Sequence, residues 1–239
     1  MSLGTTSPAN RLLAALPRDE WERLMPHVVA VELPLGMVLF EPGGARHRLY
    51  FPTTAIVSLM YVTERGDSTQ FAVIGREGVV GVSLFLGGST APHRAVVQSA
   101  GQGFCIEAEV MKHEFEHSVA LRHLMLRYTQ ALITQMAQTA ACARHHSLDQ
   151  RLCRWLLMAL DRLEGPEIVV TQEAIAHMLG VRREGVTEAA HKLRTNGVIR
   201  YARGHITVLD RAALEHQACE CYAVVNKEYE RLLSHGDVA

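Results

Sequence analysis

The 239-residue sequence lacks the features that mark several large classes of protein. No apolar run approaches the roughly 18 residues that a membrane-spanning helix needs, so we expect no contact with a membrane. The N-terminal segment has no basic stretch ahead of a long apolar core, which argues against a secretory signal peptide. There is no internal repeat and no low-complexity tract, which excludes a repeat architecture.

Neither sign of charge is in excess, and cysteine is scarce. The chain carries 24 Lys and Arg against 25 Asp and Glu, so we do not expect a surface that binds polyanions everywhere. The five cysteines are an odd number without a secretory cue, which fits reduced thiols better than a disulfide framework. We therefore expect a cytoplasmic protein, long enough for one large core or two modest ones.

Glycine is frequent in the first half of the chain and absent from Glu109 to Glu164. Many short strands at spacings of about 8–12 residues predict a sandwich, jelly roll or small barrel. Four residues, Glu64–Asp67, separate the apolar runs Ala55–Thr63 and Ser68–Ile74, and they include Gly66, as β-hairpin connections often do. The clearest apolar runs are Ala55–Thr63, Ser68–Ile74 and Arg94–Gln98.

The segment Ser118–Ala143 is predicted to form a long helix with two apolar faces. Because one domain usually covers only one face, we expect the other face to pack on a second copy of the chain in a short coiled coil. A core helix fully buried in a monomer is the alternative. One face carries Leu121, Met125, Tyr128, Leu132, Gln135, Thr139 and Cys142. The other face carries Leu126, Ile133, Met136, Ala140 and Ala143.

Two short helices joined by a glycine turn are predicted farther along the chain. They are preceded by a helical segment, Ser147–Leu163, which ends at Glu164-Gly165-Pro166. Thr171 then suits a helix N-cap, and Gly180 suits the left-handed residue that follows a last helical turn. The next helix opens at Arg182 or Arg183 and keeps its polar side outward, which is the helix-turn-helix arrangement.

A hairpin with a basic tip follows the second short helix. Val198–Tyr201 and His205–Val208 flank a turn that contains Arg203 and Gly204. Residues 182–205 hold six Lys and Arg against two Glu, 6 − 2 = +4, whereas the whole chain has a net charge of −1. This contrast indicates a localised contact with a polyanion. An ordinary helix pair packed with a hairpin is the alternative. The arginine-tipped hairpin, here called the wing, and the two arginines at the helix start argue against it.

A β-rich domain, a long helix and a winged helix-turn-helix, in this order, resemble the Crp/Fnr family of bacterial transcription regulators over residues 12–233. The resemblance is strongest over TQEAIAHMLGVRREGVTEAAHKLRTNGVIRYARGHITVLD. It implies an α+β fold, with a cyclic-nucleotide-binding-like jelly roll at 1–117, a dimerisation helix at 118–145 and a winged helix-turn-helix at 146–239. It also implies a homodimer that binds near-palindromic double-stranded DNA, works with RNA polymerase and is not an enzyme.

The resemblance also assigns residues. Arg183 and Glu184 match the base-reading pair of the family, in which arginine binds guanine and glutamate accepts from cytosine. Glu188 departs from the arginine that cyclic-AMP-responsive members tend to have, so the target sequence need not be theirs. The predicted DNA-binding residues are Thr171, Gln172, Arg182, Arg183, Glu184, Thr187, Glu188, His191, Lys192 and Arg203. The predicted dimer interface comprises Leu121, Met125, Tyr128, Leu132, Ile133 and Met136.

Cyclic AMP is not expected as the effector. Members that bind it have a Gly-Glu-aliphatic-Gly turn for the ribose and an arginine for the cyclic phosphate. Here the turn reads GVVG, with Val79 in place of the glutamate, and His93 stands at the arginine position. Loss of a charge-assisted bond to the ribose costs about 1.5–3 kcal/mol. A degenerate pocket for another small ligand, or for none, is predicted from Val79, Val80, Gly81, His93, Arg94 and Tyr128.

No metal site or cofactor is predicted. The iron–sulfur branch of the family needs N-terminal cysteines, and the first cysteine here is Cys105. Cys219 and Cys221 are predicted in one helix, where residues two apart point to different faces and cannot bind one ion. Buried structural thiols are therefore preferred over redox sensing. Two histidine pairs have some ligand character without an evident third ligand, His113 with His117 and His145 with His146.

Two other functions remain open from the sequence. A cupin-like metal-dependent enzyme with a helical tail would need histidines and a carboxylate that converge inside a barrel, for which His47, His93 and Glu107 are candidates. A protein-interaction module that uses the two-faced helix only for assembly would leave the arginine pair and the wing unexplained.

Overall fold

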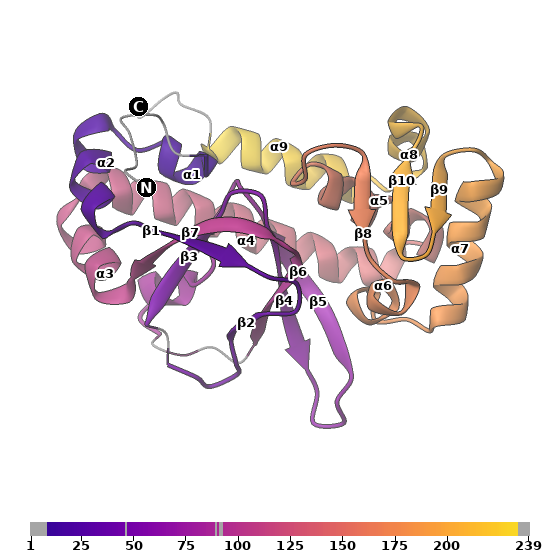
Figure 1. Cartoon of the computed structure of the whole chain (residues 1–239), viewed down its shortest axis with the longest axis horizontal. Helices are drawn as coiled ribbons and strands as arrows, with labels where there is room; N and C mark the ends of the chain where they lie inside the picture. Colours follow the sequence, from indigo (N-terminus) through magenta and orange to yellow (C-terminus); the bar gives the residue numbers. More distant parts are fainter. Residues whose placement is uncertain (1–8, 46, 89, 91–92, 234–239) are drawn as a thin grey trace.

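A computed structural model describes residues 9–233 apart from positions 46, 89, 91 and 92. A β-rich domain and a smaller mixed domain lie along the longest axis of the molecule, and a long helix runs past the first toward the second (Figure 1). The predicted α+β fold, with a jelly roll, a long helix and a winged helix-turn-helix, is confirmed. Among the described residues, no helix has the length and apolar character needed to cross a membrane.

Two antiparallel sheets form the β domain, and their strands are β1 (Val29–Leu33), β2 (Val38–Phe40), β3 (Arg48–Pro52), β4 (Ile56–Val62), β5 (Ser68–Ile74), β6 (Arg94–Ser99) and β7 (Gly101–Glu107). One sheet has the order β1-β7-β3 and the other has the order β2-β6-β4-β5. The three apolar runs predicted as strands are β4, β5 and β6, and Gly66 in the β4–β5 turn has a φ of 87°. Alternate side chains of these strands fill the space between the sheets, including Leu33, Phe51, Ile56, Ile74 and Ile106.

Helical segments precede β1, and they were not predicted from the sequence. The first is a single turn that begins at Asn10. The buried Asn10 side chain accepts from the backbone N–H groups of Leu12 and Leu13, and it donates to the carbonyls of Pro52 and Gly78 at 2.8 and 3.0 Å. Long-range hydrogen bonds therefore fix this turn on the β domain. The segments are α1 (Arg11–Ala14), α2 (Arg18–Leu24) and a 3₁₀ turn at Met25–His27.

The long helix α4 (Val119–His145) follows the shorter α3 (Ala108–His117) and packs on β5 and on α9 (Cys221–Leu233). Gln135, in the middle of α4, accepts from the backbone N–H of Val73 at 2.6 Å and donates to the carbonyl of Val73 at 3.2 Å. The helix is thus fastened to β5 by the kind of paired hydrogen bonds that a neighbouring strand would make.

The C-terminal domain contains α5 (Leu148–Leu160), β8 (Glu167–Val169), α6 (Gln172–Leu179), α7 (Arg183–Thr195), β9 (Ile199–Ala202), β10 (His205–Val208) and α8 (Arg211–Gln217). Ser147 and Gln150 form a capping box that begins α5. The small sheet has the order β8-β10-β9, so the predicted hairpin has a third strand, β8, that was not predicted.

Contacts between the two domains hold the helix-turn-helix beside the β domain. Arg162, just after α5, forms a salt bridge with Glu77 at 2.8 Å, and the two side chains are only 6% and 12% exposed. In the turn after α6, a Cβ on Gly180 would lie 2.9 Å from Oγ1 of Thr69 at the start of β5. The turn of the helix-turn-helix therefore rests directly on a strand of the β domain.

Candidate nucleic-acid interface

The first helix of the pair, α6, has defined ends. Thr171 caps it by accepting from the backbone N–H of Ala174 at 3.1 Å. Gly180 follows the last turn with a φ of 63°, a conformation that glycine adopts without a steric penalty. The chain then turns sharply and enters α7 at Arg183, the second of the two predicted start residues.

The second helix, α7, has an apolar inner face and a polar outer face. Val186, Ala189, Ala190 and Leu193 are buried against the rest of the domain. The predicted DNA-binding residues of α7 lie on the outer face, where Arg183, Glu184, Thr187, Glu188, His191 and Lys192 are all exposed. The helix thus presents a continuous polar surface that starts at its N-terminal end.

Two arginines at the start of α7 differ from Lys192 in the same helix. Within the described part of the chain, the guanidinium groups of Arg182 and Arg183 form no salt bridge. Lys192, by contrast, lies 3.1 Å from Asp149 and 3.2 Å from Glu188, and hydrogen bonds with these two carboxylates raise its pKa. Arg182 and Arg183 therefore leave two positive charges at the N-terminal end of α7 that no described carboxylate neutralises.

Other predicted DNA-binding residues connect the two helices. The hydroxyl of Thr187 on α7 donates to the Oε1 atom of Gln172 on α6 at 2.7 Å. This contact fixes the position of the α7 outer face relative to α6. Thr171 has its side-chain oxygen engaged in the helix cap.

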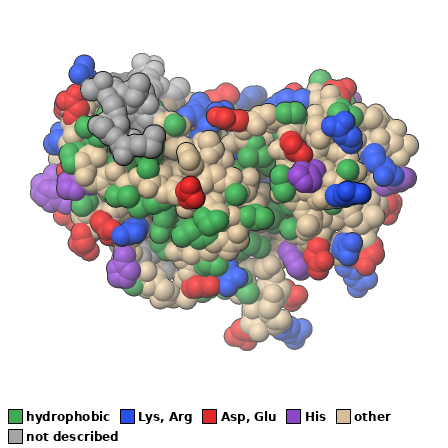
Figure 2. Space-filling view, viewed as in Figure 1, with side chains coloured by type: hydrophobic (Ala, Val, Ile, Leu, Met, Phe, Trp, Pro, Cys, Tyr) green, Lys and Arg blue, Asp and Glu red, His purple; other side chains and the backbone are tan. Residues whose placement is uncertain are grey.

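The wing presents its basic residue at a tight turn. Arg203 and Gly204, between β9 and β10, have φ values of 49° and 83°, as a two-residue type I′ turn requires. Arg203 is exposed, and its guanidinium has no salt bridge among the residues that the structure covers. Figure 2 shows Lys and Arg side chains at the end of the molecule that holds α7 and the wing. The local excess of positive charge therefore lies on the surface of the helix-turn-helix.

The predicted effector pocket is a less coherent group. Val79 and Val80 are fully buried core residues, and Tyr128 is fully buried with its hydroxyl donating to the carbonyl of Val79 at 3.2 Å. Arg94 is held by Glu41, with guanidinium–carboxylate distances of 2.7 and 3.0 Å, and this hydrogen bonding lowers the pKa of Glu41. The Arg94 guanidinium is thus engaged by a carboxylate of its own chain.

The remaining members of this group also have neighbours within the chain. The ring of His93 packs edge-on against Phe71 with centroids 5.3 Å apart. Gly81 has a φ of 120° and precedes the 3₁₀ turn Val82–Leu86. One pocket in the described residues lies elsewhere, between β5, α4 and α5, and a second is lined by residues of α1, α5 and α9.

The structure corrects the predicted dimer interface. Leu121, Met125, Tyr128 and Leu132 are at most 1% exposed because their face of α4 packs on the β domain and on α9. A partner chain cannot reach these four side chains in this conformation. Ile133 is 49% exposed and Met136 is partly buried, so only these two of the six lie toward the accessible face. The exposed apolar residues of α4 are Val119, Leu126, Ile133, Ala137, Ala140, Ala141 and Ala143.

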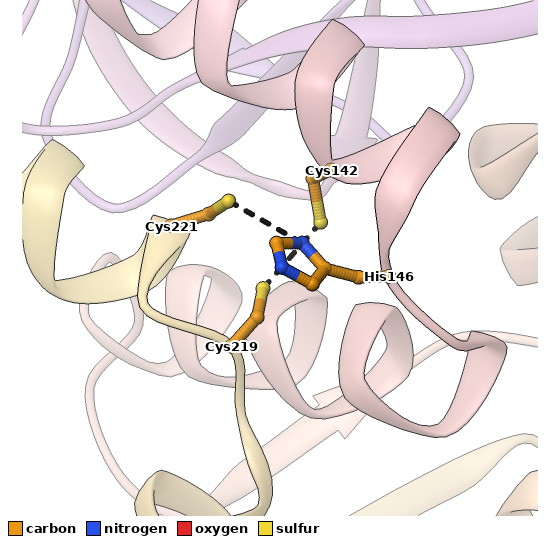
Figure 3. A group of neighbouring side chains, drawn as sticks. All are labelled: Cys142, His146, Cys219 and Cys221. Carbon is orange, nitrogen blue, oxygen red and sulfur yellow. Dashed lines mark hydrogen bonds between the residues drawn. The ribbon is translucent and has the colours of Figure 1, made fainter.

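The placement of the late cysteines is also corrected. Cys219 precedes α9 and only Cys221 belongs to it, so the two thiols are not held to different faces of one helix. Both converge with Cys142 of α4 and with His146, the residue after α4 (Figure 3). The Cys142 and Cys219 sulfurs are 3.5 Å apart. Their hydrogen bond raises the pKa of Cys142 and lowers that of Cys219, because one thiol donates to the other.

The candidate ligands of the cupin-like alternative do not come together in the structure. Glu107 is exposed at the end of β7 and forms a salt bridge with Arg48 at 2.7 Å. His47 is exposed as well, and His93 packs on Phe71. The rings of His113 and His117 stack 4.2 Å apart on the exterior of α3. These candidates do not converge on a common ion.

Comparison with known proteins identifies the C-terminal domain. Residues 150–217 match a family model described as a Crp-like helix-turn-helix domain. A global nitrogen regulator from Synechocystis sp. is 26% identical over 217 residues, covering 87% of this chain and 96% of that protein. The transcriptional regulator LdrP from Thermus thermophilus is 31% identical over 133 residues, covering 52% of this chain and 63% of that protein.

Solved structures share the fold over about four fifths of the chain. FixK2 from Bradyrhizobium japonicum has a TM-score of 0.70 at 14% identity, covering 80% of this chain and 98% of that chain. A CRP-family transcriptional regulator from Thermus thermophilus has a TM-score of 0.64 at 22% identity, covering 79% and 96% respectively.

Proposed function

We propose that this chain, which is a transcription regulator of the Crp/Fnr family with a helix-turn-helix DNA-binding domain, binds a near-palindromic DNA site as a homodimer. One observation carries the proposal. The exposed N-terminal end of α7 presents Arg182 and Arg183 without salt bridges among the described residues, and the wing turn presents Arg203 in the same state. Free guanidinium groups on an exposed helix start and on a wing are the groups that base and phosphate contacts require.

The outer face of α7 supports readout in the major groove. A guanidinium fork matches the O6 and N7 acceptors of guanine, and a carboxylate can accept from the amino group of cytosine. We assign these roles to Arg183 and Glu184, since both are exposed at the start of the helix. Arg203 at the wing turn and Arg182 are assigned to the phosphate backbone. Thr187 and Gln172 orient the helix pair through their mutual hydrogen bond.

Dimerisation is proposed through the exposed face of α4. Val119, Leu126, Ile133 and Ala140 are spaced seven residues apart, which is the repeat of a coiled-coil seam. Val119, Leu126 and Ile133 are 56%, 44% and 49% exposed in the single chain. A second copy would cover this seam and place two α7 helices about a two-fold axis, which accounts for a near-palindromic site.

The proposed regulator does not depend on cyclic AMP. Val79 offers no carboxylate to a ribose, and the guanidinium of Arg94 is already bound by Glu41. Its activity would then respond to another signal, or to no signal at all. We propose RNA polymerase as its protein partner, because a regulator bound to DNA near a promoter acts on the polymerase that binds there.

Selection of bound duplexes from random DNA, at one fixed moderate salt concentration, tests the proposal. The full chain is used with and without added cyclic AMP. We expect the same near-palindrome, with half-sites about one helical turn of DNA apart, to be enriched in both arms. Enrichment of single half-sites would overturn the dimer. Enrichment only with cyclic AMP would overturn the assignment of Val79 and Arg94, and no enrichment in either arm would count against sequence-specific binding.

A further inference from the structure

Four potential metal ligands from two distant parts of the chain converge at the end of α4. Cys142 and His146 come from the last turn of α4 and the residue after it, Cys219 comes from the segment before α9, and Cys221 is the first residue of α9. One ligand atom from each side chain lies within 4.8 Å of the other three. Figure 3 shows the sulfur atoms directed toward the imidazole. The protein therefore brings together three thiols and one imidazole.

The spacing of these atoms suits a tetrahedral ion. Zinc binds sulfur at about 2.3 Å, so two sulfur ligands of one tetrahedral zinc ion lie about 3.8 Å apart. The Cys142 and Cys219 sulfurs are 3.5 Å apart, and the Cys221 sulfur is 3.6 Å from Nδ1 of His146. Both distances are far longer than a covalent disulfide bond. The group therefore needs small adjustments to close around an ion.

The surroundings of His146 favour metal binding through Nδ1. Its other ring nitrogen, Nε2, lies 3.2 Å from the carboxylate of Glu220. Histidine ligands of metals usually donate their second ring N–H to such a group, which fixes the tautomer and the ring orientation. Glu220 stands between Cys219 and Cys221, so one short segment supplies two ligands and this supporting carboxylate.

Burial and charge also fit a structural metal ion. The three cysteines are 2–4% exposed and the His146 side chain is 17% exposed, so the sulfur ligands are shielded from bulk water. Three thiolates around a divalent ion leave one negative charge, and the guanidinium of Arg154 is one of the charges that act on Cys142 and Cys221. Arg154 is itself buried at 7% exposure, and its Nε atom has no hydrogen-bond partner among the described residues. A buried cation beside the cluster would offset the net charge of the site.

We propose that Cys142, His146, Cys219 and Cys221 bind one zinc ion in a closed Cys₃His site. On binding, the three thiols release their protons to solvent and the neutral imidazole supplies a lone pair. Residues 147–218, which hold the entire helix-turn-helix, lie between the two ligand pairs. The ion therefore fastens the two ends of the DNA-binding domain to each other at the end of the long helix.

Metal analysis of the full chain, purified in reducing buffer from zinc-supplemented cells and freed of any histidine tag, tests the proposal. We expect one zinc ion per chain. The metal content should fall to background when Cys142, Cys219 or Cys221 is replaced by serine. Matched controls are Cys105→Ser and Cys153→Ser, which replace two other buried cysteines outside the cluster and should keep the zinc. Retention of zinc in Cys219→Ser, or its absence from the unaltered chain, would overturn the site.

A second measurement covers variants that fail to fold. Cobalt(II) added to the reduced, metal-free unaltered chain should give a sulfur-to-metal charge-transfer band and the intense visible bands of a tetrahedral ion. Glu220→Gln should keep this spectrum and weaken zinc binding about 10- to 100-fold in competition with a chelator. A spectrum without charge-transfer bands would overturn the site. So would a reduced chain that binds neither zinc nor cobalt.

The experiments on the metal site and on the proposed function can overturn one proposal without the other. Selection of DNA by a metal-free chain would leave the regulator intact and remove only the metal ion. A zinc-loaded chain without DNA affinity would do the reverse.

Discussion

Trp155 on α5 donates from its indole Nε1 to Oε1 of Gln70 on β5 at 3.0 Å, across the boundary between the two domains. Gln70 in turn donates to Ser58 and Gln98 at 2.6 and 2.8 Å, and Ser58 donates to Gln98 at 2.6 Å. Ser58, Gln70 and Gln98 are all buried on adjacent strands. An indole from the DNA-binding domain therefore completes a polar network inside the β domain.

Replacing Trp155 by phenylalanine should destabilise the chain. The substitution keeps an aromatic ring but leaves Oε1 of the buried Gln70 without its donor, which should lower the free energy of unfolding by about 1–3 kcal/mol. Urea denaturation measures the change. Trp21→Phe, at a half-buried tryptophan on α2, is the matched control. Equal losses in both variants would show that the interdomain hydrogen bond contributes nothing beyond the removal of an indole.

Replacing Arg183 by alanine should weaken specific DNA binding by about 1–3 kcal/mol and relax one base position of the selected site. The guanidinium at the start of α7 is free to bind a base, and alanine removes it without disturbing the helix. Titration of the selected duplex and of its single-base variants measures both effects. Arg18→Ala on α2, which removes an exposed arginine paired with Glu22, should leave both unchanged. An unaltered site preference for Arg183→Ala would show that another residue reads the base.

Replacing Arg203 by alanine should weaken binding to all DNA sequences alike. A phosphate contact carries no sequence information, and its loss should reduce the slope of log affinity against log salt by about 0.9. Titrations of one specific and one unrelated duplex over a range of salt concentrations measure the slope. Arg231→Ala on α9, where the arginine pairs with Glu228, is the control. An unchanged slope for Arg203→Ala would remove the wing from the interface.

Replacing Ile133 by glutamate should convert the dimer into monomers. The side chain is 49% exposed in the single chain, so the substitution spares the core, but a carboxylate in the proposed seam would be buried without a partner. Analytical ultracentrifugation gives the oligomeric state, and circular dichroism checks that the fold is retained. Leu35→Glu changes a leucine on the β domain that is 62% exposed, and this variant should stay dimeric. A dimeric Ile133→Glu would place the interface elsewhere.

The helix-turn-helix could be predicted from the sequence because its signals are local. The cap at Thr171 and the left-handed Gly180 act within one turn of the helices they bound, and the structure shows both. The turn at Arg11–Ala14 also has a local cap, in which the Asn10 side chain accepts from the backbone N–H groups of Leu12 and Leu13, but a helix of four residues is too short to be stable on its own. It depends on hydrogen bonds from Asn10 to Pro52 and Gly78, and such long-range partners cannot be deduced from neighbouring residues.

Two features, the covered face of α4 and the cysteine cluster, could not be predicted from the spacing of apolar residues. The spacing of apolar residues on α4 indicates two faces, but it does not say which one the β domain and α9 cover, and the face with Tyr128, predicted in the dimer interface, is the covered one. The cysteine cluster was missed because a regular helix was assumed through Cys219 and Cys221. The spacing of Cys142 and His146, four residues apart near a helix end, was the one local signal that could have pointed to it.

The C-terminal helix α9 does not end in the DNA-binding domain. It returns along α4, where the hydroxyl of Tyr229 accepts a hydrogen bond from Gln135 at 3.0 Å. The DNA-binding domain thus leaves the body of the protein after His146 and rejoins it at Cys219, and the sulfur of Cys219 lies 3.5 Å from that of Cys142. Because these two covalent connections are adjacent, any rotation of the DNA-binding domain about the line through them must first break the Arg162–Glu77 salt bridge and the Trp155–Gln70 hydrogen bond.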